Sequence, residues 1–214
     1  MAHPGESRLS KHIRGTALLA LVLVAPFHPL GAQAAPQNVA ADVQFMQGMI
    51  EHHAQALVMV ALIPSRTHRD DMRQVGRRIE ISQRDEIGMM QRWLAAHGEA
   101  VPTLDSNKVA HMPGMDMPGM DMPGMALMPG MLTQEQLDQL AHATGPEFDR
   151  LFLQGMIGHH KGALTMVAQL FATPGGGQAS DIFRFASDVD TDQRAEIDRM
   201  QAMLDRSAAP VRSP

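Results

Sequence analysis

The chain has 214 residues, 44% of them apolar, and a formal net charge of −5, so it can form one large domain or two small ones. It contains no cysteine, which excludes disulfides, thiolate metal sites and thiol nucleophiles, and an acidic balance without a basic run argues against nucleic acid as a partner. Its 19 methionines exceed the usual need for this residue in a core, and any soft metal ligand must be a thioether.

Residues 1–34 have the pattern of an export signal. Basic residues precede an apolar stretch at residues 16–27, and Ala32-Gln33-Ala34 supplies a small-x-small cleavage pattern. The apolar stretch is too short to span a bilayer, and the alternative is that it is retained as a membrane anchor. We therefore predict a periplasmic or secreted protein with no membrane span after cleavage.

Residues 35–97 are expected to form a first helical hairpin. In its first half, side chains at steps of four, three, four, three and four share one helical face: Phe45, Met49, His52, Ala56, Met59 and Ile63. Pro64 ends this helix, and residues 69–96 carry a second apolar stripe. Both segments are predicted to bury one face.

Residues 98–132 are rich in Pro, Gly and Met, have no helical or strand period, and are expected to be a flexible linker. The tetrapeptide Met-Pro-Gly-Met occurs four times, beginning at residues 112, 117, 122 and 128. Its central Pro-Gly predicts a type II turn with the outer Cα atoms within about 7 Å, so each unit can direct two sulfurs at one point.

Thioethers favour Cu(I), so this linker is a candidate copper-binding array. Its predicted ligands are His111, Met112, Met115, Met117, Met120, Met122, Met125, Met128 and Met131. The alternative is a Pro/Gly spacer whose repeats arose by slippage. Exposed, oxidisable methionines suit a spacer poorly, and we favour metal binding.

Residues 133–207 are expected to form a short helix and a second hairpin that repeats the first. Thr133 is the predicted N-cap of the short helix, and Thr144 starts the following long one. The segment Gln47-Gly48-Met49-Ile50-Glu51-His52-His53 recurs as Gln154-Gly155-Met156-Ile157-Gly158-His159-His160. Two hairpins packed together predict an all-α, antiparallel four-helix bundle formed as one domain.

Paired histidines at equivalent places in the repeats are the candidate ligands within the helices. His52 and His159 lie on the apolar stripes, and His53 and His160 are turned about 100° from them. Imidazole suits copper, and the predicted ligands are His52, His53, His159 and His160 with Met49, Met59, Met156 and Met166. The alternative is that the histidines are structural, because duplication copies either kind.

The second helix of each repeat carries polar residues spaced to support these histidines. They are Gln83 and Glu86, and Gln193 and Glu196, each pair three residues apart and so on one side of a helix. We expect them to accept hydrogen bonds from the imidazole N–H groups and fix the ring orientation. Hydrogen bonds that simply tie paired helices together are an equal alternative.

These motifs resemble the bacterial family known as domain of unknown function 305. The resemblance lies in Asp-x-x-Phe-x-x-x-Met-Ile-x-His-His-x-x-Ala-x-x-Met followed by Gln-x-x-Glu-Ile-x-x-Met, at residues 42–59 with 83–90 and at 149–166 with 193–200. It implies a ferritin-like four-helix bundle. The family includes a secreted copper-binding protein linked to copper resistance, which supports the same histidines and methionines as candidate ligands.

The leading hypothesis is therefore an exported protein that binds Cu(I), with Cu(II) as a second candidate, for copper buffering, sequestration or resistance. Its expected partners are copper ions and other copper-handling proteins, and no catalytic residues are assigned. One alternative is a structural or interaction bundle with incidental metal affinity. The other is a di-iron oxidase, which the lack of any Glu-x-x-His motif disfavours.

Overall fold

In the computed structural model, the described residues are Met1, 39–103 and 127–208. They form the helices α1 (Val39–Ala61), α2 (Ile63–Arg66), α3 (Asp70–Ala96), α5 (Gln134–His142), α6 (Gly145–Ala172) and α7 (Ser180–Ala208), and no strand occurs among them. The prediction of an all-helical fold is confirmed. The expected export signal falls almost wholly outside the described residues.

Two helix boundaries lie at residues that the sequence indicates. Pro64 lies in the first turn of α2, so α1 stops before it, at Ala61. The Oγ1 of Thr133 accepts a hydrogen bond from the backbone N–H of Gln136 (3.2 Å), whose side-chain oxygen accepts from the N–H of Thr133 (2.9 Å). This reciprocal capping box confirms the predicted N-cap of α5.

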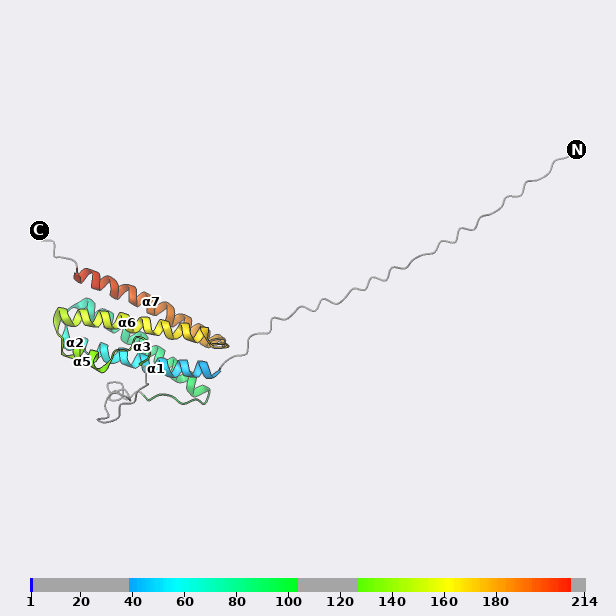
Figure 1. Ribbon diagram of the computed structural model, residues 1–214, viewed down its shortest axis with the longest axis horizontal. Helices are drawn as coiled ribbons and strands as arrows, with labels where there is room; N and C mark the ends of the chain where they lie inside the picture. The colour runs from blue at the N-terminus through cyan, green and yellow to red at the C-terminus, as the bar shows by residue number, and fades with distance from the viewer. Residues whose placement is uncertain (2–38, 104–126, 209–214) are drawn as a thin grey trace. The chain divides into compact units, whose positions relative to one another are not determined.

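The four long helices pack pairwise along one another (Figure 1). Helix α1 contacts α3 within the first repeat, α6 contacts α7 within the second, and α1 contacts α6 across the two. The predicted stripes face inward at these contacts, and Met49, His52, Ala56 and Met59 are all completely buried. The α1–α6 contact therefore brings the two histidine pairs into one region.

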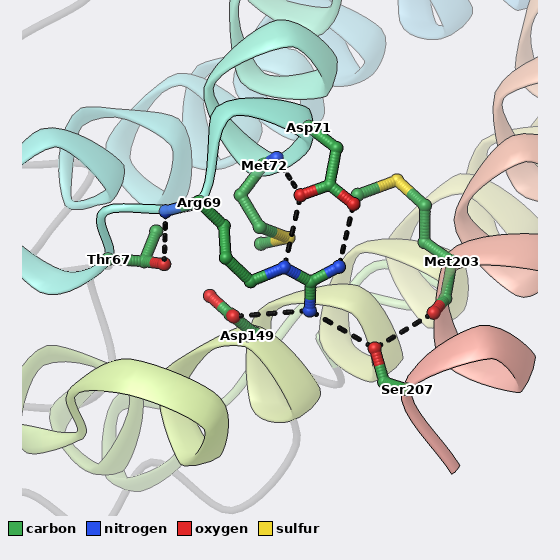
Figure 2. Close-up of polar contacts among 7 residues, drawn as sticks. All are labelled: Thr67, Arg69, Asp71, Met72, Asp149, Met203 and Ser207. Carbon is green, nitrogen blue, oxygen red and sulfur yellow. Dashed lines mark hydrogen bonds and ion pairs between the residues drawn. The ribbon is translucent and has the colours of Figure 1, made fainter. Parts of the chain in front are cut away.

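Each repeat also places one buried aspartate against a connection in the other repeat. The Asp42 carboxylate in α1 accepts a hydrogen bond from the backbone N–H of Gly177 (2.7 Å), between α6 and α7. The equivalent Asp149 in α6 accepts from a guanidinium nitrogen of Arg69 (3.3 Å), just before α3 (Figure 2). Arg69 also pairs with Asp71 at 2.6 Å. The two repeats are thus tied at both ends.

Candidate metal centre

The four histidines form one buried cluster where α1 meets α6. Their exposed fractions are 0% for His52, His53 and His160 and 1% for His159. The imidazole rings of His52 and His159 lie against each other, with centroids 3.9 Å apart and planes inclined by 38°. The repeats therefore bring together the residues that the sequence singled out as pairs.

The outer histidine of each pair is hydrogen-bonded to a glutamate on the neighbouring helix. His53 Nε2 lies 2.5 Å from a carboxylate oxygen of Glu86, and His160 Nε2 lies 2.6 Å from one of Glu196. Both carboxylates are nearly buried, with exposed fractions of 5% and 4%. Each glutamate therefore accepts a hydrogen bond from an imidazole, as expected, and the same atoms take part in both repeats.

The inner histidines donate to backbone carbonyls. His52 Nε2 lies 3.0 Å from the carbonyl oxygen of Pro129, and His159 Nε2 lies 2.9 Å from that of His52. A carbonyl only accepts, so each Nε2 carries the proton. Burial, aided by the neighbouring histidines, lowers the pKa of His52 to about 3 and also lowers that of His159. Both rings are neutral at physiological pH, with a free lone pair on Nδ1.

All four Nδ1 atoms are buried without a hydrogen-bond partner among the described residues. Buried polar atoms are nearly always paired in native proteins, so four orphans at equivalent positions require an explanation. Histidines that ligate metals usually donate their other ring N–H to a carboxylate or a backbone carbonyl. These four rings have that arrangement, with Nε2 engaged and Nδ1 available as a ligand.

The glutamines three residues before each glutamate are placed differently from our expectation. Gln83 and Gln193 are both 1% exposed, and neither amide nitrogen nor amide oxygen has a partner in the described part of the chain. The imidazole N–H groups go to the glutamates and carbonyls instead. The glutamines therefore add two further unsatisfied polar groups to the interior.

The helix methionines lie in two separate parts of the core. Met59 and Met156 belong to one apolar cluster, and Met49 and Met166 belong to the other. The Met59 methyl reaches toward Gly155 of the second repeat, and the Met166 methyl reaches toward Gly48 of the first. Each core cluster thus mixes thioethers from both repeats.

Carboxylates and imidazoles alone do not converge into a closed site. Within residues 39–103 and 127–208, no group of three or more His, Asp or Glu side chains is arranged to hold a metal ion. A metal bound at the histidine Nδ1 atoms would therefore need thioethers or water to complete its coordination. Copper(I) accepts such mixed nitrogen and sulfur ligands.

The last Met-Pro-Gly-Met unit of the expected linker packs on the helices. The N–H of Met131 donates to the carbonyl of Met128 (3.1 Å), and Gly130 has a φ of +75°. These features confirm the predicted type II turn for this unit. The other array candidates, His111, Met112, Met115, Met117, Met120, Met122 and Met125, lie outside the described residues.

Two residues that the sequence analysis did not single out hold this turn in place. Gln55 is completely buried, and its amide bonds both the N–H of Leu132 (2.8 Å) and the carbonyl of Leu132 (3.0 Å). At Gly162, a Cβ atom would lie 1.8 Å from the carbonyl oxygen of Pro129. Because Gln55 and Gly162 occupy the same position in the two repeats, this break in the duplication was the available signal.

The family model described as a domain of unknown function (DUF305) matches residues 42–204. The chain belongs to the DUF305 family. The matched range holds both histidine pairs, both glutamates and the residues between the repeats. No curated protein matches the chain significantly.

Several solved structures are similar to this chain. A DUF305 fragment from Deinococcus radiodurans is 27% identical, with a TM-score of 0.62 over 80% of this chain and 99% of that one. A DUF305 protein from Streptomyces coelicolor, described as a candidate secreted protein, is also 27% identical, with a TM-score of 0.62 over 79% and 94%. CopM in its Cu(I)-bound form is 24% identical, with a TM-score of 0.57 over 78% and 98%.

Proposed function

We propose that this DUF305 protein binds copper outside the cytoplasm, Cu(I) first and Cu(II) second, and serves copper buffering, sequestration or resistance. The ligands in this proposal are the helix histidines and methionines together with the methionine array. No turnover is required of it. For the fold we propose the ferritin-like, antiparallel four-helix bundle that the repeated hairpins predict.

The four unpaired Nδ1 atoms are the observation that carries the proposal. Each belongs to a buried histidine whose Nε2 is already hydrogen-bonded. Leaving a buried acceptor unsatisfied costs about 1–3 kcal/mol, and metal coordination at these nitrogens, completed by thioethers or water, would offset that cost. The absence of cysteine leaves imidazole and thioether as the ligands suited to copper.

Similar proteins and the sequence support the same proposal. CopM has been solved in Cu(I)-bound, Cu(II)-bound and silver-bound forms, and its likeness to this chain makes copper the first metal to test. The signal-like residues 1–34 support export. None of the helices in the described part of the chain is long and apolar enough to cross a bilayer.

A Cu(I) competition titration against a colorimetric chelator tests the proposal. The variant His53→Gln/His160→Gln should lose tightly bound copper, because it removes two of the four Nδ1 ligands. A second variant lacking residues 111–125 removes array ligands while leaving the docked turn at 128–131 intact. The matched control is His142→Gln, since His142 is solvent-exposed and outside the cluster.

The two variants separate the possible results. Loss of tight binding in the histidine variant, but not in the control, supports a site in the helices. Unchanged copper binding in the histidine variant, with loss on deletion of residues 111–125, would move the site to the array and leave the histidines structural. No competitive binding by the unmodified protein would remove copper altogether and favour the interaction bundle.

A further inference from the structure

The docked turn brings one of its thioethers to a methionine of the helices. The Sδ of Met128 and the Cε of Met166 each lie 3.5 Å from the point that a Cβ atom would occupy on Gly48. The ends of the two side chains are therefore no more than twice that distance apart. Because Gly48 has no side chain, no Cβ atom of its own occupies that point.

A cavity gives access to this pair. It has a volume of about 410 Å³ and is lined by Met128, Met166, Gly48, Phe45, Pro129 and Leu170, among others. Met128 is partly exposed, and Met166 is 9% exposed. The pair thus combines a partly exposed residue of the last Met-Pro-Gly-Met unit with a residue of the apolar core.

The equivalent position of the other repeat has only one thioether. There the nearest atom to the corresponding point on Gly155 is a methyl carbon of Leu132, at 3.2 Å, and the methyl of Met59 follows at 3.4 Å. Helix α5 forms part of the wall of the cavity at this position through Gln136, Gln139 and Leu140. Among the nearest described atoms, the equivalent glycines therefore have two neighbouring thioether side chains in one repeat and one in the other.

We propose that Met128 and Met166 form a two-thioether site for a soft monovalent metal, Cu(I) or Ag(I), at the junction of the array and the helices. The site relies on the proposed function for the choice of copper, but its geometry is independent of the histidines. Neutral thioethers bind such metals without losing a proton. One ligand comes from the linker and one from α6, so a bound ion joins the two parts of the chain.

Silver(I) titration of the purified protein, with its methionine methyl groups labelled with ¹³C, tests this pair directly. Silver(I) is diamagnetic and is not oxidised by air. Each methyl signal therefore stays sharp and reports the environment of its own methionine. We expect the Met128 and Met166 signals to shift together in one binding step. In Met128→Leu the shift of Met166 should be lost, while Met90→Leu, changed in the same core cluster at a methionine that is not an assigned ligand, should leave it intact.

The second repeat offers a gain-of-function variant. Leu132→Met places a second thioether beside Met59, so the silver-dependent shift of the Met59 methyl signal should become larger than in the unmodified protein. Leucine and methionine exchange at modest cost in cores, and Leu132 shows that leucine fits the position equivalent to Met128. Both variants are therefore expected to fold.

Each result decides the inference. A Met166 signal that does not shift when silver is added, or that shifts equally in Met128→Leu, would rule out the proposed site. An unchanged Met59 signal in Leu132→Met would contradict the geometry on which the pair rests. Because His53→Gln/His160→Gln retains both thioethers, coupled Met128 and Met166 shifts in that variant would keep this site even if the histidine site fails.

Discussion

Gln55 and Gly162 occupy one and the same position of the two repeats, yet they hold the docked turn in opposite ways. Gln55 forms two hydrogen bonds with the backbone of Leu132. Gly162 has no side chain, so the carbonyl of Pro129 can lie close to the backbone of α6. Around them, the His–Glu pairs are alike, at 2.5 and 2.6 Å. The repeats thus keep the histidine cluster and diverge where the linker's end is seated.

The largest effect should come from filling the space at Gly162. In Gly162→Ala the new methyl group would lie 1.8 Å from the Pro129 oxygen, so the turn must move, and we expect a loss of about 3 kcal/mol in the free energy of unfolding. Gly158→Ala is the control, since no atom of the described residues lies within 4 Å of its added Cβ, and removing a helical glycine should stabilise by about 1 kcal/mol. Urea unfolding measures both, and equal effects would refute the close approach.

Removing the two hydrogen bonds of Gln55 should lower the free energy of unfolding by somewhat less. Gln55→Leu leaves the N–H and C=O of Leu132 buried without their partners, and we expect a loss of about 2 kcal/mol. The control Gln47→Leu removes an exposed hydrogen bond to the carbonyl of Ala100 and should change stability by less than about 0.5 kcal/mol. If the two variants unfold at the same urea concentration, the turn is not held by Gln55.

Because the His–Glu pairs are alike in the two repeats, the two glutamates should contribute equally to copper affinity. Glu86→Gln and Glu196→Gln should each weaken copper affinity by roughly 10- to 100-fold, because each removes the carboxylate that orients one histidine. Glu80→Gln, which alters only an exposed pair with Arg84 on the same helix, should have no effect. A titration in which only one glutamate matters would show that the two repeats do not contribute equally to the site.

The smallest effect should separate the two equivalent aspartates. Asp149→Asn removes the ion pair with Arg69 and should cost about 1 kcal/mol, a value reduced by the partial exposure of the guanidinium. Burial raises the pKa of Asp42, although the Gly177 N–H opposes the shift, so its charged form is disfavoured in the folded state. Asp42→Asn keeps an acceptor for that N–H and should cost less at pH 7 than Asp149→Asn. Equal losses in urea unfolding would contradict this difference.

Much of the helical framework could be predicted from spacing. The buried faces follow from apolar residues at intervals of three and four, and the helix boundaries follow from Pro64, Thr133 and Thr144. These signals are local, so one sequence is enough to reveal them. The duplication likewise pointed to His52, His53, His159 and His160 as one set.

The finer organisation of the site depends on contacts between residues far apart in the chain. No spacing rule indicates that His52 donates to Pro129, 77 residues away, or that Met128 and Met166 both lie beside Gly48. The linker was expected to be flexible over residues 98–132 because Pro and Gly form no periodic pattern, but residues 127–132 are held by tertiary hydrogen bonds. Such contacts become visible only when the helices are assembled.

The crossed aspartates have a consequence for how the protein unfolds. Asp42 is partnered by the connection of the second hairpin, and Asp149 is partnered by the connection of the first. Separating the hairpins breaks a hydrogen bond to a carboxylate at each end and exposes the apolar faces where α1 contacts α6. Residues 39–103 and 127–208 should therefore lose their structure in one cooperative transition, as small single domains do, and a cut between them should leave the two fragments associated.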